Sequence, residues 1–498
     1  MSTNPLDETV AFRGDYIHGA FVPPGPGVRF VSRDPARDGA EVLAAVSEPE
    51  AVDVAVASAR RAADGWRRLP LTERAAHLQR LAAKAKEHEA RIALAITREM
   101  GKPLAESRTE AGSIAAKVQA TISQLPHELP PAAPGAPGEQ RFHALGVVAV
   151  IGPFNFPVHL VNTHVIPALL TGNTVVVKPS EITPLSGQCY AELFDDANLP
   201  PGVFNLIHGL GATGGALAAH EGIDGVIFTG SYATGRRIRQ ATFDQPWKQV
   251  SLELGGRNPA VVLDDAHLDQ AVREILLGAF LSSGQRCTAT SRIIVTQGIA
   301  EKLQKRLVAA ISALKPGDPM DATTFMGPLA TFAARDRFMS LLADARAEGA
   351  RPLVESEALP GGAFVTPSLY QVRGDERFLR EEFFGPHLDL EVAESDEDAF
   401  DRAARNPYGL SASLFTARPE LLDTFYDRVR AGVINFNRST NGASGLLPFG
   451  GTGMSGNWRA AGSLAPRLCT FPVAVMSEPM GRLTPNATLD AQLSETRR

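Results

Sequence analysis

One of the three cysteines of this chain lies in a stretch whose composition favours chemistry over packing. SSGQRCTATSR, Ser282 to Arg292, places Cys287 among small and polar residues with an arginine on either side. A free thiol titrates near ~8.5, and nearby positive charge lowers that pKa and raises the reactive thiolate fraction. Free cysteines are usually inert and buried, which is the expectation for Cys189 and Cys469. The stretch therefore predicts a nucleophile at Cys287, with a buried structural thiol as the alternative.

Two further stretches hold side chains that could assist a thiol nucleophile. VSLELGGRNP places Glu253 between two leucines, where partial burial would raise its pKa toward the range of a general base. A solvent-facing strand glutamate is the alternative. IGPFNFP places Asn155 in a turn bracketed by prolines, where a rigidly held amide could donate to an oxyanion or simply form the turn.

Glycines that follow apolar runs indicate a nucleotide site. In VIFTGSYATGRRI, Gly230 and Ser231 end such a run and Gly235 opens a helix, which suits a pyrophosphate at a helix N-terminus. Lys178 and Glu181 follow the run NTVVV, where they could hold ribose hydroxyls or form a surface ion pair. GLGATG also matches GxGxxG, which is a weak signal when it stands alone.

The elements that must position these side chains are short β-branched runs alternating with helical patterns. Such alternation predicts parallel βαβ units and open twisted sheets. Earlier in the chain the spacing predicts helices over 51–66, over one long segment 71–103, and around 106–125. HELPPAAPGAPGE, 127–139, must be loop or extended chain, and FPVAVMSEP near the end predicts a late strand that pairs outside its own domain.

Length, charge and cysteine content exclude several classes of protein. A chain of 498 residues is too long for one hydrophobic core, so two or three domains are expected. The net charge of −6 argues against a nucleic-acid surface, and neither a membrane-spanning apolar run nor a signal-peptide pattern is present. Three cysteines without CxxC or HxxxH argue against a disulfide framework and a zinc or other metal site, and favour a reducing cytoplasm.

Seven motifs follow one another along the chain: PFNFP, KPSE, FTGS with its spaced Gly235, LELGG, GQRC, EEFFGP and PFGG. In this order they resemble the NAD(P)-dependent aldehyde dehydrogenase superfamily, and the resemblance covers roughly residues 15 to 480. The resemblance implies an α/β fold with a Rossmann-type NAD-binding domain over 1–125 and 143–252 and an α/β catalytic domain over 253–445. It also implies a β oligomerisation arm from 126–142 and 465–490, and hence a homodimer or homotetramer.

The resemblance implies a role for each matched residue. Cys287 would attack an aldehyde to give a thiohemiacetal and then a thioester, Glu253 would activate the hydrolytic water, and Asn155 with the Cys287 backbone N–H would hold the oxyanion. The residues that would bind NAD are Phe154, Lys178, Glu181, Gly230, Ser231, Gly235, Leu254, Glu382 and Phe384. Arg257 and Phe154 stand where the family usually has lysine and tryptophan. Glu181 would repel a 2′-phosphate and so favours NAD over NADP.

Other stretches are most similar to one subgroup of that family, which oxidises N-succinyl-L-glutamate 5-semialdehyde to N-succinyl-L-glutamate in arginine catabolism. They are FNFPVHLVNTH, LPPGVFNLIHG, NFNRSTNGAS, PFGGTGMSGNWRAAG and LTPNATLD, with SGNWR departing from a more usual SGNHR-like spelling. A small-molecule substrate with several carboxylates needs cations or amide donors, and the candidates are Lys117, His159, Asn162 and Arg459. The alternatives are another aldehyde or semialdehyde dehydrogenase, a CoA-acylating or phosphorylating relative, and a non-catalytic NAD-binding relative.

Overall fold

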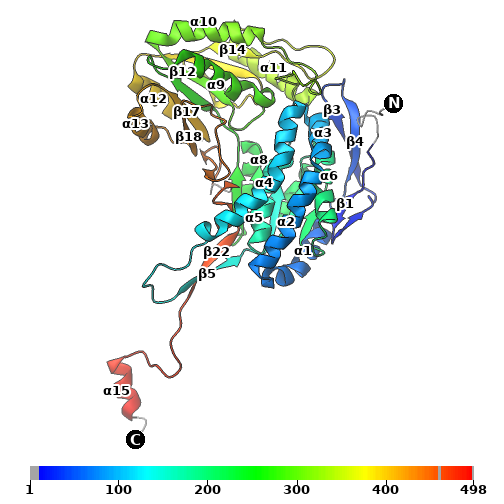
Figure 1. Ribbon diagram of the computed structural model, residues 1–498, viewed down its shortest axis with the longest axis vertical. Helices are drawn as coiled ribbons and strands as arrows, with labels where there is room; N and C mark the ends of the chain where they lie inside the picture. Colours follow the sequence, from blue (N-terminus) through cyan, green and yellow to red (C-terminus); the bar gives the residue numbers. More distant parts are fainter. Residues whose placement is uncertain (1–9, 458–460, 496–498) are drawn as a thin grey trace.

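The computed structural model describes residues 10–457 and 461–495, which form two α/β bodies and a ribbon that projects from one of them (Figure 1). Each body is built on a seven-stranded sheet whose strands are mostly parallel. The prediction of an α/β fold with open parallel sheets is confirmed.

The first sheet has the strand order β10-β9-β6-β7-β8-β1-β2. Its parallel strands are β6 Val147–Ile151, β7 Thr174–Lys178, β8 Phe204–Leu206, β9 Gly225–Thr229 and β10 Gln249–Glu253, and β1 Asp15–Ile17 and β2 Ala20–Val22 form an antiparallel edge. The helices α5 His159–Leu170, α6 Pro184–Asp196, α7 Gly211–Ala219 and α8 Tyr232–Ala241 follow its strands. β6 and β7 are buried along their whole length, as expected for β-branched runs covered on both faces.

The N-terminal part adds a ribbon and four helices to this body. They are β3 Val28–Asp34, β4 Ala40–Ser47, α1 Ala51–Arg68, α2 Leu71–Glu87, α3 Glu89–Met100 and α4 Leu104–Glu128. The prediction of one long helix over 71–103 is wrong, because the chain leaves helical geometry at His88, where ψ is 2°. Both helices pack on α4 and α6, and in addition α3 packs on β3 and α2 packs on α5. The His88 ring also contacts Asp196 at 2.7 Å at the end of α6.

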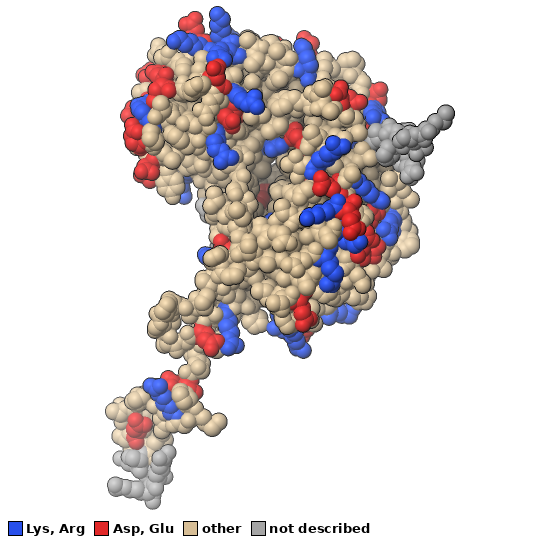
Figure 2. All heavy atoms as spheres, viewed as in Figure 1, with Lys and Arg blue, Asp and Glu red and all other residues tan. Residues whose placement is uncertain are grey.

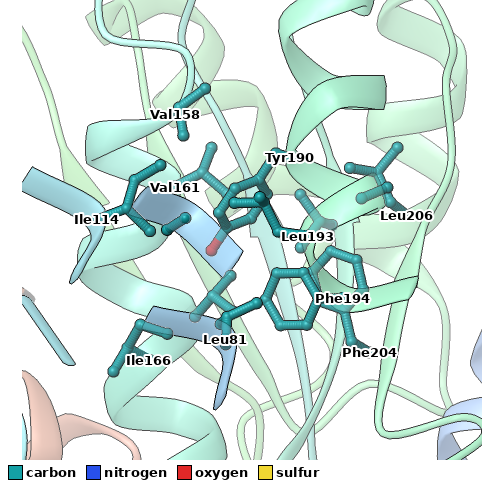
Figure 3. Packing of buried hydrophobic residues seen from close by; sticks show 14 of the residues in the cluster. Leu81, Ile114, Val158, Val161, Ile166, Tyr190, Leu193, Phe194, Phe204 and Leu206 are labelled. Carbon is teal, nitrogen blue, oxygen red and sulfur yellow. The ribbon is translucent and has the colours of Figure 1, made fainter. Parts of the chain in front are cut away.

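An aromatic core fixes the helices of this body against the sheet (Figure 3). The rings of Phe194 on α6 and Phe204 on β8 stack with centroids 3.6 Å apart, and Tyr190 meets both edge-on. Leu81 of α2 and Ile114 of α4 belong to the same buried cluster. This buried cluster therefore fixes the positions of α4 and α5.

The second sheet has the strand order β13-β14-β15-β12-β11-β17-β18. Its strands are β11 Asn258–Val262, β12 Thr290–Thr296, β13 Arg351–Val354, β14 Ser368–Gln371, β15 His387–Ala393, β17 Ser411–Phe415 and β18 Val433–Phe436, with only β13 antiparallel to its neighbour. Its helices are α9 Leu268–Phe280, α10 Gln297–Ala313, α11 Phe332–Ala347, α12 Asp396–Ala404 and α13 Leu421–Arg428. α9 and α10 cover one face of the sheet, and α12 and α13 the other.

The remaining elements are short, apart from the projecting ribbon. They are η1 Leu281–Gly284, η2 Arg377–Arg380, β16 Tyr408–Gly409, β19 Pro448–Phe449, β20 Thr452–Gly453, β21 Ala461–Gly462 and α14 Ala465–Leu468. In the ribbon, β5 Glu139–Ala144 pairs antiparallel with β22 Thr470–Val475, so the late strand pairs with a segment far away in sequence. The chain then leaves the ribbon and ends in α15 Ala487–Glu495, away from both bodies (Figure 1).

Candidate active site

One cavity of about 1040 Å³ contains most of the residues singled out from the sequence. It lies at the carboxyl ends of β6, β7, β9 and β10, the usual ligand position in an open parallel sheet, and a turn of the second body closes it. Figure 2 shows a hollow where the two bodies meet. The predicted residues that line the cavity are Asn155, Glu253, Cys287, Phe154, Lys178, Glu181, Gly230, Ser231, Leu254, Glu382 and Phe384.

Cys287 follows a backbone turn of unusual geometry. Ser282, Ser283 and Gly284 have φ values of 51°, 55° and 74°, the left-handed region that side-chain-bearing residues rarely adopt. Beyond the turn, the Asn258 side chain donates to the Cys287 carbonyl at 2.8 Å and to the next strand at Ala289 O, 2.9 Å. The backbone that carries the thiol is therefore fixed from both sides.

The flanking arginines do not activate the thiol. Burial, followed by the negative charges of Glu382 and Glu253, raises the pKa of Cys287 to about 12. Arg286 forms an ion pair with Glu106 at 2.5 Å and Arg292 one with Glu391 at 2.5 Å, so neither charge is left to stabilise a thiolate. The prediction of a depressed thiol pKa is therefore wrong, and the resting group is a neutral thiol.

The other two cysteines are packing residues, as predicted. Cys189 and Cys469 are both buried, and burial raises the pKa of each thiol to about 12. Cys287 differs from them because it is only partly buried and lines the cavity.

The LELGG motif positions two carboxylates. Glu253 is the buried last residue of β10, and its backbone carbonyl accepts from Gly230 N at 3.0 Å. Glu382 accepts from Gly256 N at 2.9 Å, and burial raises its pKa to about 7. A Cβ on Gly255 would lie 2.1 Å from the Glu382 carboxylate, and one on Gly256 would lie 2.5 Å from the Cys287 carbonyl oxygen. Gly256 is thus required by close approach to backbone, whereas the atoms nearest a Gly255 Cβ belong to the end of the Glu382 side chain.

The PFNFP turn reaches the cysteine segment directly. Asn155 Nδ2 donates to the Gln285 carbonyl at 2.9 Å, two residues before Cys287. An amide nitrogen carries two hydrogens, so this contact leaves one for an oxyanion. Phe154 meets Phe384 edge-on, with centroids 5.7 Å apart, and Phe384 itself has a φ of 50°.

The opposite end of the cavity has the groups that a dinucleotide needs. Ser231 caps α8 by accepting from Thr234 N, so the free N–H groups of that helix end point toward the cavity wall formed by Gly230 and Ser231. Lys178 donates to Glu181 at 3.2 Å, and burial lowers the pKa of its ammonium. A helix N-terminus for phosphate, with a cation and a carboxylate for ribose hydroxyls, fits NAD.

Gly235 is the one predicted cofactor residue that is absent from the cavity lining. A Cβ on Gly235 would lie 2.8 Å from Leu254 Cδ2, so this glycine lets α8 pack closely on the strand end. The weak GxGxxG match does contribute, because Gly211 and Gly214 line the cavity and a Cβ on Gly214 would lie 3.4 Å from the Lys178 side chain.

Three of the predicted substrate residues, Lys117, His159 and Asn162, do not line the cavity. Lys117 donates to the Gly462 carbonyl at 3.1 Å, and burial lowers its pKa to about 8. His159 Nδ1 lies 2.7 Å from Ser113 Oγ. The Asn162 side chain is fully buried and donates to Ile114 O while it accepts from Tyr190 Oη, so its prediction as a substrate contact is not supported. Arg459 lies outside the described residues.

Several lining residues escaped the sequence analysis. They are Tyr232, Arg237, Arg337, Arg380, Glu381, Tyr408 and Met454. Arg380 and Glu381 belong to the REEFFGP stretch and Met454 belongs to the PFGGTGMSGN stretch, so these residues could have been found from the motifs. Tyr408 could not, because nothing local marks it.

Arg257, which departs from the family pattern, has buried partners of its own, although its Nη1 has none. It is almost fully buried, pairs with Asp389 at 2.5 Å and donates through Nε to the Leu379 carbonyl. Asp389 in turn meets the His387 ring at 3.0 Å. The arginine therefore ties the end of LELGG to the loop that carries Glu382.

Metal-ligand clusters and membrane-spanning helices are both absent from the described residues, 10–457 and 461–495. No three His, Cys, Asp or Glu side chains in these ranges gather as metal ligands would. No helix in the same ranges is both long and apolar enough to cross a membrane.

Comparison with known proteins places these features in a family. The Aldehyde dehydrogenase family profile matches residues 23–470. An N-succinylglutamate 5-semialdehyde dehydrogenase of Vibrio cholerae is 42% identical over 433 residues, 86% of this chain and 89% of that protein. One of Burkholderia ambifaria is 40% identical over 467 residues, 92% of this chain and 95% of that protein.

Solved structures with a similar fold are also aldehyde dehydrogenases. An aldehyde dehydrogenase C mutant of Pseudomonas syringae in complex with NAD+ and octanal has a TM-score of 0.91 at 31% identity, covering 97% of this chain and 100% of that one. Lactaldehyde dehydrogenase of Escherichia coli has a TM-score of 0.88 at 32% identity, covering 93% and 99%.

Proposed function

The chain belongs to the aldehyde dehydrogenase family, and from that premise we propose that it oxidises N-succinyl-L-glutamate 5-semialdehyde to N-succinyl-L-glutamate with NAD as cofactor. The observation that carries the chemistry is the shared cavity lined by Cys287, Glu253 and Asn155 together with a nucleotide cradle. The named relatives, 40–42% identical over most of the chain, support the choice of substrate.

The reaction begins at Cys287, whose sulfur adds to the aldehyde carbon as the thiol gives up its proton to solvent water. The oxyanion of the thiohemiacetal is held by Asn155 Nδ2–H and the Cys287 backbone N–H. When bound, NAD accepts the hydride that leaves the aldehyde carbon, so the thiohemiacetal becomes a thioester. Glu253 then takes a proton from water, the resulting hydroxide attacks the thioester carbon, and the carboxylate product leaves as the thiol is restored.

The cofactor is held by residues of both bodies. Gly230, Ser231 and the N-terminus of α8 bind the pyrophosphate, with Gly235 letting that helix lie close. Lys178 and Glu181 bind the adenosine ribose, and Glu382 binds the nicotinamide ribose. Phe154, Leu254 and Phe384, which line the same cavity, would pack beside the nicotinamide end. Because Glu181 repels a 2′-phosphate, NAD is preferred over NADP.

Glu253 favours hydrolysis over transfer of the acyl group to CoA or phosphate. Those other acceptors need no water-activating carboxylate, whereas this chain buries one at the cavity wall. For the substrate carboxylates we keep His159 and Arg459 as candidates, and His159 lies in the chain just beyond the Asn155 turn and is half-buried.

We place the protein in the cytoplasm as an oligomer. Three free cysteines fit a reducing compartment. A two-stranded ribbon that projects from the body is marginal on its own, so β5 and β22 are assigned to contact with a second copy in a homodimer or homotetramer. Lys and Arg are interspersed with Asp and Glu on the face drawn in Figure 2, which gives no basic stripe for nucleic acid there.

The test is a comparison of initial rates of NADH formation from succinylglutamate semialdehyde, succinate semialdehyde, glutamate semialdehyde and a simple aldehyde, with NAD and NADP in parallel. The highest kcat/KM is expected for succinylglutamate semialdehyde with NAD. A higher value for one of the other aldehydes would overturn the substrate assignment.

Three variants check the chemistry in the same assay. Cys287→Ala is expected to abolish turnover while NAD still raises the thermal midpoint, and Cys189→Ala, a change at a buried packing thiol, is the matched control that stays active. Glu253→Gln is expected to give one burst of NADH per site and then stall. Steady turnover in Glu253→Gln would instead support an acceptor other than water.

A further inference from the structure

The turn before Cys287 needs support from outside itself. Its three consecutive positive φ values, at Ser282, Ser283 and Gly284, persist only where surrounding contacts impose them. The two serines cannot relax as glycine would, because a side chain in the left-handed region is strained. The position of the thiol therefore depends on whatever holds this turn.

One carboxylate supplies much of that support. Glu106 Oε1 accepts from Ser282 N at 3.0 Å, and Oε2 accepts from Ser282 Oγ at 2.7 Å and from Arg286 Nη2 at 2.5 Å. Arg286 Nε also donates to Ser282 Oγ at 3.1 Å, which closes the network. Glu106 lies in the first turn of α4, where the helix dipole favours an acid.

Besides Asn155, which donates to the Gln285 carbonyl, the other supports of the turn come from its own body. Ser283 Oγ donates to the Gly327 carbonyl at 2.7 Å, and Gln285 Oε1 accepts from Ala330 N at 2.9 Å. A Cβ on Gly284 would lie 2.3 Å from the Gly385 carbonyl oxygen. Glu106, by contrast, belongs to the first body, like Asn155, so it sets the turn relative to the oxyanion donor.

We propose that Glu106 is a positioning residue whose carboxylate holds the Ser282–Gly284 turn and the Arg286 guanidinium, and so fixes Cys287 relative to Asn155. The inference rests on the proposed role of Cys287 as the nucleophile. It gives Arg286 a structural role, because the guanidinium is committed to Glu106 and lies over the Phe156 ring, 5.1 Å from its centroid. Arg286 is then neither the activator of the thiol nor a receptor for a substrate carboxylate.

The test compares Glu106→Ala and Glu106→Gln with a matched control on the same helix. Glu128, at the other end of α4, also pairs with an arginine, Arg467, at 2.9 Å, so Glu128→Ala removes an equivalent ion pair far from the thiol in sequence. For each variant, kcat and KM are measured with a carboxylate-bearing semialdehyde and with a simple aldehyde. The alkylation rate of each cysteine by iodoacetamide is followed by peptide mass spectrometry.

If the turn is loosened, kcat is expected to fall while the alkylation rate of Cys287 rises. In Glu106→Ala, kcat is expected to fall about a hundredfold for both aldehydes, the cost of a misplaced reacting group, with KM little changed. Alkylation of Cys287 is expected to become faster because the turn no longer confines it, while Cys189 and Cys469 stay protected. Glu106→Gln should give the same changes but smaller, because its amide oxygen still accepts from Ser282 N. Glu128→Ala should match the wild type.

Three results would overturn the proposal. The first is wild-type kcat and wild-type Cys287 alkylation in both Glu106 variants. The second is a KM that rises only for the carboxylate-bearing aldehyde at unchanged kcat, which would make the Arg286–Glu106 pair a substrate site. The third is faster alkylation of all three cysteines together, which would mean general unfolding. Alkylation needs no aldehyde turnover, so an error in the proposed substrate or reaction would leave this readout intact.

Discussion

At the scale of single residues, the resting thiol is held in its neutral form by its surroundings. Burial is the larger cause of the raised Cys287 pKa, and the negative charge of Glu382 is the next. Deprotonation must therefore accompany attack or follow a change around the thiol when ligands bind. This protects an otherwise reactive group while the site has no substrate.

Glu382→Gln is expected to lower the Cys287 pKa, because it removes a negative charge that disfavours the thiolate. The pKa stays above its ordinary value since burial remains. The pH profile of Cys287 alkylation should shift to lower pH, with about tenfold faster alkylation per pK unit at a pH below the new midpoint. Glu381→Gln, a change at the exposed neighbour, is the control with an unshifted profile. Identical profiles for Glu382→Gln and wild type would contradict the electrostatic explanation.

The polar residues around Cys287 predict a reactive cysteine, but they predict the wrong direction for the shift of its pKa. The reason lies in distance along the chain. Glu106, which neutralises Arg286, precedes it by 180 residues, and Glu382 follows Cys287 by almost a hundred. The charges near Cys287 in the sequence are those of the two arginines. The carboxylates that pair with these arginines come from distant parts of the chain, so only the fold reveals them.

At the scale of elements, the strand β10 and the two glycines after it organise both halves of the site. Glu253 ends the strand, Gly255 admits Glu382, and Gly256 admits the Cys287 carbonyl. The spacing of LELGG thus encodes two contacts with segments remote in sequence. Motif matching found the residues, and only the structure explains why Gly256 cannot carry a side chain.

Gly256→Ala is expected to lower kcat roughly a hundredfold, since its Cβ would lie 2.5 Å from the carbonyl oxygen of Cys287 and displace that backbone. Gly65→Ala is the matched control. Gly65 lies exposed inside α1, where a Cβ would meet nothing within 4 Å. It should keep full activity and gain about 0.5–1 kcal/mol in the free energy of unfolding. Urea unfolding and NADH formation measure both, and a fully active Gly256→Ala would refute the packing argument.

Helix boundaries show the limit of pattern analysis at this scale. The spacing of apolar residues over 71–103 predicts one uninterrupted helix, and no proline or glycine marks the break at His88. The two helices share α4 and α6 as packing partners, and only the contacts of α2 with α5 and of α3 with β3 distinguish them. The end at Gly101, where φ is 74°, was by contrast readable from the sequence.

At the scale of the whole molecule, the two bodies contribute complementary groups to one cavity. The first supplies Asn155, Glu253 and the cofactor cradle, and the second supplies Cys287 and Glu382. The sequence predicted strands for both sheets, because each short β-branched run indicates a strand without reference to the rest of the chain. It could not give their mutual placement, on which the Glu106 network depends.

Phe471→Arg is expected to shift the protein toward smaller species in sedimentation velocity. Phe471 is exposed on β22, where a charge would oppose burial against a second copy. Tyr426→Arg, the same kind of change at an exposed aromatic residue of α13, should leave the sedimentation coefficient unaltered. An unchanged coefficient for Phe471→Arg would exclude the ribbon as the contact.

The pairing of β5 with β22 has a consequence for how the chain comes into being on the ribosome. Residues 139–144 meet residues 470–475, and β10 is flanked by late chain too, since Leu254 N donates to Ser455 O at 2.9 Å. An N-terminal domain normally folds as it is synthesised, but here β5 and β10 lack these neighbours until residues 455–475 have emerged. A nascent chain stalled before residue 455 would carry the nucleophile and its base without the segment that flanks the base, so the reactive centre is finished only after that segment has been made.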